Sequence, residues 1–234
     1  MFRSFPAMLL LLAAMTLADG QQPQAPAAAQ GNTSQAPVDK RIFGVLPNYR
    51  TANAVDPFVP LTTRRKFHIA TKDSLDYPSY ILAGAFAALY QLDDTHPSFR
   101  QGMAGYGRRY GTAVVDQVVG NYMTEAIMPA LTREDPRYFR RGYGGNWSRI
   151  AYAATRIFVT RTDSGGTNFN YSEIFGNAIA AGVANAYYPD ERRLSDNFER
   201  LCTQLATDSF SQVLKEFWPD IKRKYLRKHA SNDE

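Results

Sequence analysis

Clusters of Pro, Gly and Asp divide the chain after Thr62 into segments that favour helix, and this pattern limits the possible folds most strongly. Strand signals are nearly absent from the same region. Most of these segments open on a side chain that can cap a helix, such as Thr62, Asp76 or Ser98. The expected helices are 62–74, 76–92, 98–132, 146–159, 170–188 and 195–218. The sequence therefore predicts an all-α fold, a compact bundle of about six helices in one domain.

Small residues recur four positions apart inside three of these helices. The groups are Gly84 with Ala88, Gly107 with Gly111, and Gly176 with Ala180 and Ala184. Because Gly and Ala leave room for a second backbone, this spacing predicts close-packed Gly/Ala crossings. The helix 78–92 is apolar on nearly every face, so we expect it at the centre of the bundle. Residues 137–141 are expected to form at most a short basic helix.

Residues 1–61 contain no strong helix signal after the first apolar run. Residues 1–20 have a positive start, an apolar stretch and small residues before Gly20, which is typical of a cleavable signal peptide. We expect cleavage after Gly20 and export to the periplasm or outside the cell; an uncleaved anchor is the alternative. Residues 21–37 are predicted to be a disordered tether, and residues 38–61, with three prolines, an extended arm before the helical domain 62–234.

Composition excludes several classes of protein. The 234 residues include 27 Lys and Arg against 22 Asp and Glu, a formal charge of +5, and 44% are hydrophobic. These values are ordinary for a globular domain and exclude a wholly disordered chain. The single cysteine, Cys202, has no partner within the chain and excludes a disulfide scaffold. We expect Cys202 to be a small buried residue.

Three charged residues inside apolar helical segments are speculative catalytic candidates. Asp116 and Glu125 are nine residues apart, which places them on opposite sides of an ideal helix. Arg156 lies between Arg149 and Arg161 on one predicted helix and can bind a phosphate or carboxylate. The alternative is that these arginines form structural salt bridges with Asp116, Glu125 or Glu173.

Recognised motifs for metals and cofactors are missing from the sequence. Asp93 and His96 have the spacing of helical metal ligands, but Pro97 indicates that the helix ends there and no second pair exists. The chain contains no HExxH, GxSxG or P-loop motif and no dinucleotide-binding fingerprint. The sequence therefore predicts no metal and no cofactor.

Basic and aromatic residues are interleaved near the C-terminus, and this segment is a candidate for membrane or anion contact. Its members are Trp218, Lys222, Arg223, Lys224, Arg227 and Lys228. Such a segment can lie on an anionic membrane surface, where each basic residue contributes about 1 kcal/mol. The alternative is a solvated helix end, where cations suit the helix dipole. The predicted partners are an anionic membrane surface or another envelope protein, and not nucleic acid, which an exported protein rarely meets.

Four strings carry a resemblance to a known family. They are RIFGVLPNYRT (41–51), EDPRYFRRG (134–142), TRTDSGGTNFNYSE (160–173) and FWPDIKRK (217–224). They are similar to strings in a family of uncharacterised exported bacterial helical proteins, over a region from Arg41 to Lys224. The resemblance implies one exported domain. It implies no activity and no catalytic residue.

Two functions follow as hypotheses. The first is a non-catalytic envelope protein, a structural or binding helical domain that contacts the membrane from one side. The second is a hydrolase that acts on a phosphate- or carboxylate-bearing envelope substrate, with Asp116 or Glu125 as acid or base and Arg156 as the anion clamp. A third hypothesis, insertion of helices 78–92 and 171–188 into lipid, is disfavoured because each is shorter than a membrane span.

Overall fold

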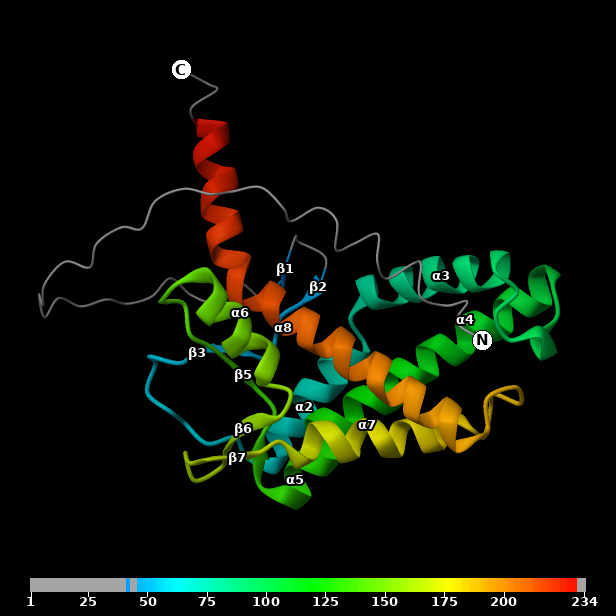
Figure 1. Cartoon of the computed structure of the whole chain (residues 1–234), viewed down its shortest axis with the longest axis horizontal. Coiled ribbons are helices and arrows are strands. Elements are labelled where there is room, and N and C mark those ends of the chain that lie inside the picture. Colours follow the sequence, from blue (N-terminus) through cyan, green and yellow to red (C-terminus); the bar gives the residue numbers. More distant parts are fainter. Residues whose placement is uncertain (1–40, 43–45, 231–234) are drawn as a thin grey trace, which may run out of the picture. The chain divides into compact units, whose positions relative to one another are not determined.

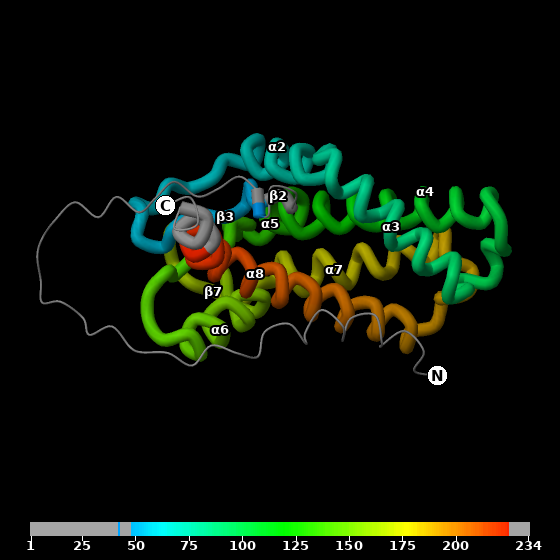
Figure 2. Tube along the Cα trace, turned by 90° about the horizontal axis from the view of Figure 1, so that it is seen from above, coloured from blue at the N-terminus to red at the C-terminus, as the bar shows by residue number. Residues whose placement is uncertain are grey.

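A long helical rod forms the middle of the molecule. It consists of α4 (Gly102–Asn121), a π-helix (Tyr122–Ile127) and α5 (Met128–Thr132). The computed structural model describes residues 41–42 and 46–230. Within them, α2 (Thr63–Ser74) and α3 (Tyr77–Leu92) pack against one side of the rod, and α7 (Tyr171–Ala184) packs against the other (Figures 1 and 2). The predominantly helical fold predicted from the sequence is confirmed.

The helix starts follow local chemistry. The Thr62 side chain accepts a hydrogen bond from the Arg65 backbone N–H at the start of α2, and the Asn170 side chain accepts one from Glu173 at the start of α7. Pro78 lies in the first turn of α3, where its missing N–H costs no hydrogen bond. These are the positions at which the sequence places helix starts.

The last helix, α8 (Leu194–Ala230), crosses α6 (Asn146–Thr155) and α7. It includes Pro219 and continues past Trp218 into the basic tail, so Pro219 acts as a kink, one of the two outcomes that the sequence allows there. Figure 1 shows a change of direction in its C-terminal part, as expected where a proline removes a backbone hydrogen bond. The helix absorbs the proline as a bend because both sides of it remain helical.

Short strands join segments that are distant in sequence. The strand β1 (Arg41–Ile42) pairs with β2 (Leu46–Pro47), and β6 (Val159–Thr162) lies between β4 (Glu134–Asp135) and β7 (Thr167–Phe169). The strand β3 (Thr51–Asn53) runs parallel to β5 (Tyr138–Arg140). The expected helix at 137–141 and the expected lack of strands are therefore wrong. Long-range pairing overrides local propensity here, since the Tyr138 N–H donates to the Arg50 carbonyl at 2.8 Å.

The small-residue prediction holds at some positions and fails at others. A Cβ added to Gly176 would lie 3.0 Å from Thr124 Cγ2, so α7 closely approaches the π-helix there. A Cβ at Gly84 would lie 3.3 Å from the Tyr106 hydroxyl, which is also tight. Nothing lies within 4 Å of an added Cβ at Gly107 or Gly111, so these two are not crossing points among the described residues.

Two burial predictions are also wrong. The helix α3 is not central: Ile81 is 67% exposed and Leu92 82% exposed, and its buried side consists of Pro78, Ser79, Ala83 and Ala87. Cys202 is exposed on α8. Composition alone does not place a helix, because a helix of small and large apolar residues can bury only its small-residue side.

The interior holds many charged groups, and most of them are fully bonded. Glu216 on α8 has no exposed surface and accepts hydrogen bonds from Tyr138, Arg149 and the backbone N–H groups of Arg141 and Gly142. These bonds join α8 to β5, to the loop after it and to α6. A buried carboxylate is tolerated only with such a set of donors.

We expect Glu216→Gln to lower the free energy of unfolding by about 3 kcal/mol, because the amide nitrogen cannot accept from the donors that converge on the carboxylate and Arg149 loses one of its two acids. Urea denaturation followed by circular dichroism measures the change. Glu199→Gln, an exposed position on the same helix, is the matched control and should change it by less than about 0.5 kcal/mol. Equal effects of the two substitutions would contradict this account of the interior.

Candidate functional site

Four polar atoms that lack a partner lie in one region of the interior. They are Asp73 Oδ1, Glu125 Oε2, Arg156 Nε and Gln212 Oε1, and all four residues line two neighbouring cavities. Six further unpartnered atoms among the described residues lie outside both cavities, for example in Asn53, His96 and Asp163. Unpaired buried polar atoms are costly, and four of them beside two cavities mark a candidate site.

The larger cavity has a volume of about 410 Å³ and two chemically different walls. One wall is the side of α3 that carries Leu82, Ala83, Phe86 and Tyr90. The opposite wall is charged and includes Arg50, Asp73, Asp116, Glu125 and Lys215. A cavity of this size, apolar on one side with a few convergent polar groups, is typical of a small-molecule site.

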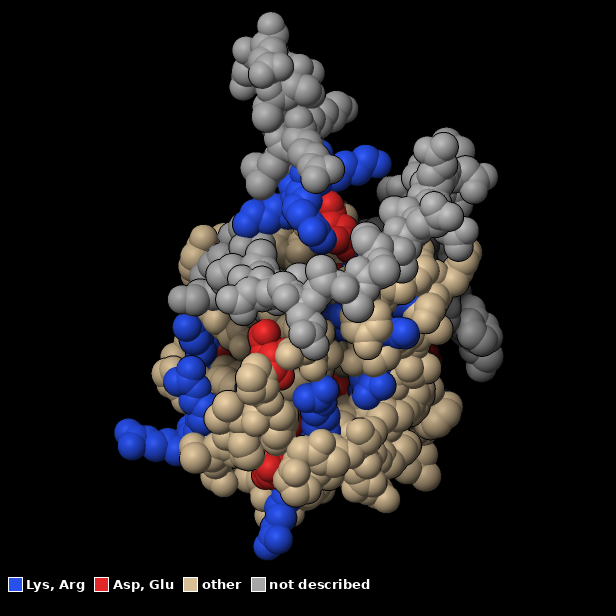
Figure 3. All heavy atoms as spheres, turned by 90° about the vertical axis from the view of Figure 1, so that its left-hand side faces the viewer, with Lys and Arg blue, Asp and Glu red and all other residues tan. Residues whose placement is uncertain are grey.

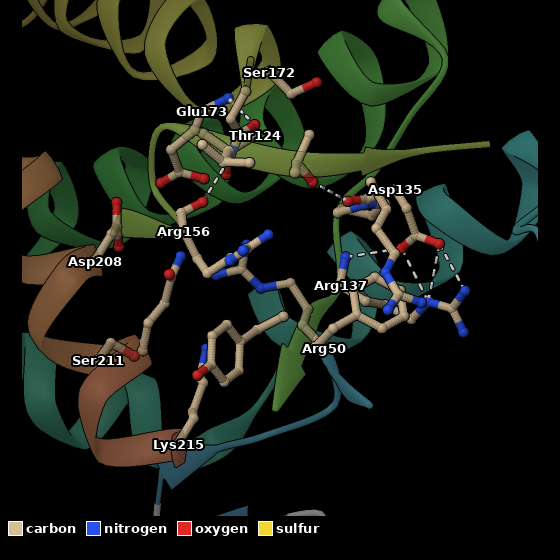
Figure 4. A pocket seen from close by; sticks show the side chains of 18 residues that line it. Arg50, Thr124, Asp135, Arg137, Arg156, Ser172, Glu173, Asp208, Ser211 and Lys215 are labelled. Atoms are coloured by element: carbon tan, nitrogen blue, oxygen red, sulfur yellow. Dashed lines mark hydrogen bonds and ion pairs between the residues drawn. The ribbon is translucent and has the colours of Figure 1, made fainter. Parts of the chain in front are cut away.

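The smaller cavity, of about 40 Å³, is lined mostly by polar and charged residues, with Pro136, Phe139 and Val159 among the apolar ones. Figure 4 shows Glu173 on one side, Asp208, Ser211 and Lys215 on another, and Arg50 and Arg156 toward the middle. Arg50, Ser211 and Lys215 line both cavities. These three residues therefore form a shared wall.

Arg50 holds a pair of carboxyl groups in the larger cavity. Its Nε lies 3.1 Å from Oε1 of Glu125 and 3.7 Å from Oδ2 of Asp73. The two acids are also joined to each other by a hydrogen bond, which requires a proton between them. Burial raises the pKa of Glu125 to about 8, and the Asp73 carboxylate adds to the rise while Arg50 opposes it. A pKa of about 8 favours the protonated form of Glu125 at neutral pH.

A second carboxyl pair lines the smaller cavity. Glu173 on α7 and Asp208 on α8 share a hydrogen bond, and the Asn177 amide lies 3.3 Å and 3.4 Å from them. Burial raises the pKa of Glu173 to about 8, and the charge of Asp208 raises it further against the effect of Arg50. The site thus has two pairs of acids, one on each side of the shared wall.

Lys215 lies in an unusual environment for a lysine. It is 7% exposed, and its ammonium group makes no hydrogen bond or ion pair within the described part of the chain. Burial lowers the pKa of Lys215 to about 8, and Arg50 lowers it further against the attraction of nearby acids. A lysine in this state can act as a cation or as a free amine near neutral pH.

The structure brings Asp116 and Glu125 to one cavity, contrary to the prediction from an ideal helix. A π-helix begins between them at Tyr122 and turns each residue through a smaller angle than an α-helix, which reduces the angle between the two side chains. Asp116 accepts hydrogen bonds from Tyr187 at 2.6 Å and Tyr188 at 2.8 Å, and Arg200 lies 3.3 Å from it.

Arg156 does not join this pair. It lines the smaller cavity only, and its guanidinium group lies 4.2 Å from the centre of the Tyr152 ring. Arg149 and Arg161 also do not form the salt bridges with Asp116, Glu125 or Glu173 that the sequence offered as the alternative. Arg149 pairs with Glu216 and Asp220, and Arg161 lies 4.3 Å from the Phe139 ring centre. Contacts between strands and helices decide these pairings, and the spacing of the arginines along the sequence does not predict them.

The candidate membrane segment lies at the end of α8. Lys222, Arg223 and Lys224 are exposed, and Trp218 is half-buried. Figure 3 shows Lys and Arg side chains gathered where the described side chains of α8 end. Arg223 forms an ion pair with Asp220 at the protein surface. Arg227 and Lys228 belong to α8, but their side chains lie outside the described residues.

Sequence reasoning missed most of the site. Arg50, Asp73, Asp208, Ser211 and Lys215 were not among the predicted residues. A signal for three of them exists: Asp208, Ser211 and Lys215 lie three and four positions apart, which places polar groups on one side of a helix. Arg50 and Asp73 carry no comparable signal, because they reach the site from other elements.

The described residues contain neither a candidate membrane span nor a candidate metal cluster. None of their helices combines the length and the hydrophobicity that a membrane span requires. No group of three or more His, Cys, Asp or Glu side chains among them is arranged to hold a metal ion.

We expect the carboxyl pairs to make stability depend on pH. Glu125 and Glu173 bind protons more tightly in the folded chain than in the unfolded chain, so their contribution is fully present below about pH 4.5 and is lost as the pH rises through about 8. Glu125→Gln should therefore reduce the fall in unfolding free energy between pH 5 and 8, by up to about 1.4 kcal/mol per pH unit. Urea titrations at several pH values measure this slope. A slope unchanged by Glu125→Gln, as we expect for Glu199→Gln, would contradict the raised pKa.

No protein-family model, no curated protein and no solved structure matches this chain. The geometry of the two cavities is therefore the basis for the functional assignment.

Proposed function

We propose that this domain binds an amphiphilic small molecule with an acidic head group. The observation that carries the proposal is the cavity of about 410 Å³ between the apolar side of α3 and the charged wall with Arg50 and Lys215. The apolar part of the ligand lies along α3 and the head group reaches the charged wall. This is the binding function expected from the sequence, with a ligand class added.

The charge balance of the wall favours an acidic head group. The raised pKa values of Glu125 and Glu173 reduce the negative charge that faces Arg50 and Lys215, and Asp116 is paired with Arg200. Arg50 engages acids through Nε, and its terminal nitrogens make no hydrogen bond within the described residues. Unengaged Arg and Lys donors are the groups that bind carboxylate and phosphate most strongly.

The opposite wall favours an apolar chain. Phe86 and Tyr90 line the cavity and remain 51% and 39% exposed, so the apolar surface continues from the cavity to the outside. Ile81 and Leu89, at 67% and 47% exposed, extend the apolar exterior of α3. A ligand with a hydrocarbon chain gains free energy by covering such surface.

The hydrolase suggested by Asp116, Glu125 and Arg156 has weaker support. A single small substrate must meet Arg156 and one of the two acids, yet Arg156 lines the smaller cavity while both acids line the larger one. That alternative stays a prediction.

We propose also that the protein is exported and contacts an anionic membrane surface through the end of α8. The exposed Lys222, Arg223 and Lys224 support this contact. Membrane lipids are themselves amphiphiles with acidic head groups, so such a contact would place the domain beside a source of its ligand.

We expect the purified protein to bind dodecyl phosphate, and Lys215→Met to weaken this binding about 10- to 100-fold, because it removes one charged hydrogen bond. Binding should also weaken as the pH rises through about 8, where Lys215 loses its charge and the carboxyl pairs lose their protons. Isothermal titration calorimetry measures both effects.

Dodecanol, which has the same chain and no charge, is the matched ligand, and Lys215→Met should change its affinity less than about threefold. Arg108→Met, at an exposed position of α4 outside both cavities, is the matched variant and should leave both affinities unchanged. Absence of dodecyl phosphate binding, or equal loss for both ligands, would contradict the proposed ligand class.

For the membrane contact, we expect more protein to sediment with vesicles that contain phosphatidylglycerol than with neutral phosphatidylcholine vesicles. Lys224→Glu with Lys228→Glu should abolish the difference, because each reversal removes attraction to the anionic surface. Arg108→Glu with Arg193→Glu makes the same change in net charge elsewhere and should retain it. Equal sedimentation with the two vesicle types would contradict the proposed membrane contact.

A further inference from the structure

The shared wall between the cavities contains a hydroxyl group that the binding function does not use. Ser211 on α8 is half-buried and lines both cavities. Its hydroxyl makes no hydrogen bond within the described residues, whereas the hydroxyls of Thr124, Thr160 and Ser172 in the smaller cavity are all engaged. Ser211 is therefore the hydroxyl of the shared wall that remains available.

Ser211 lies one helical turn before Lys215. Residues four apart on a helix have Cβ atoms about 5–6 Å apart and face the same side, so the long lysine chain can bring its amine to the serine hydroxyl. Both side chains also border the space reached by the terminal nitrogens of Arg50. The wall thus combines a hydroxyl, an amine and a cationic hydrogen-bond donor.

We propose that Ser211, Lys215 and Arg50 form a catalytic centre that hydrolyses carboxylic esters of amphiphilic molecules. Ser211 is the nucleophile, Lys215 the general base, and Arg50 the donor to the oxyanion. The proposal rests on the proposed function for the apolar half of its substrate. It assigns an activity and residues that differ from those of the hydrolase suggested by the sequence.

The reaction proceeds in two balanced halves. In the first half, Ser211 Oγ attacks the ester carbonyl carbon, and the hydroxyl proton of Ser211 passes to the neutral Lys215 amine. The carbon–oxygen bond to the alcohol then breaks, and the departing alcohol oxygen takes that proton from Lys215. In the second, a water molecule attacks the acyl-serine ester, passes a proton to Lys215, and the bond to Ser211 Oγ breaks as Oγ regains a proton. The net change is ester plus water to acid plus alcohol.

The electrostatic surroundings suit this use of Lys215. The charged groups around it are Arg50 before β3, Asp73 on α2, Glu125 on the π-helix, Glu173 on α7, Asp208 on α8 itself and, across the larger cavity, Asp116 on α4. Burial and Arg50 together lower the pKa of Lys215 to about 8, so a useful fraction of the amine is neutral near neutral pH. An ordinary lysine, with a pKa near 10.5, would be almost fully protonated there.

The test uses a dodecyl fluorophosphonate, which transfers its phosphonyl group to an activated serine with loss of fluoride. We expect the purified protein to gain one phosphonyl group, mapped by mass spectrometry to Ser211, at a rate that rises with pH through about 8. Ser211→Ala should abolish the labelling, and Lys215→Met should slow it at least tenfold. Ser209→Ala is the matched control, because Ser209 lies on the same helix outside both cavities and donates to the Ala154 carbonyl. Ser209→Ala should be labelled at the same rate as the unaltered protein.

Hydrolysis of 4-nitrophenyl decanoate provides a second measurement and should follow the same order of variants. Thermal unfolding by circular dichroism checks that each variant is folded. Labelling at another residue, or equal labelling and hydrolysis by Ser211→Ala and the unaltered protein, overturns the proposal. If the protein binds dodecyl phosphate but is neither labelled nor active, the catalytic proposal fails and the binding function stands. If Ser211 is labelled but dodecyl phosphate does not bind, the binding function fails and the catalytic centre stands.

Discussion

One constraint shapes this structure: a charged side chain that is buried must have hydrogen-bond or ion-pair partners. Glu216 satisfies four donors from β5, the following loop and α6, and in doing so it fixes α8 against the strands. Glu134 performs the same role at the start of α7, where it accepts from the backbone N–H groups of Tyr171 and Ser172. These acids are more than solubilising groups, because each connects elements that share little apolar surface. The cost of removing a carboxylate from water is offset only where such donors converge.

The same constraint produces an unusual distribution of polarity on α7. Its buried side carries Ser172, Glu173 and Asn177, while Phe175 and Ile179 are 51% and 43% exposed. The apolar cluster at the other end of the helix is small and consists of Phe99, Ala184 and Tyr188 with Tyr187 beside them. The smaller cavity lies against this polar side, where Ser172 and Glu173 line it.

The π-helix connects the architecture to the site. It interrupts the central rod between Tyr122 and Ile127 and turns Glu125 toward Arg50 and Asp73. Beside it, Gly176 lets α7 approach closely enough to bring Glu173 near the same arginine. A regular α-helix would direct Glu125 elsewhere and leave Arg50 with a single acid. The local irregularity thus places both carboxyl pairs around one cation.

The sequence by itself determined the helical class, most helix starts and the basic end of the chain, because caps, breakers and charge runs act over a few residues. It identified Glu125 and Asp116 as unusual residues, but not their shared cavity. Only the tertiary structure decided the β3–β5 pairing, the exposed place of α3 and the meeting of Arg50, Asp73 and Lys215. Those features depend on contacts between segments far apart in the chain, and helical periodicity carries no information about which partner a buried charge will find.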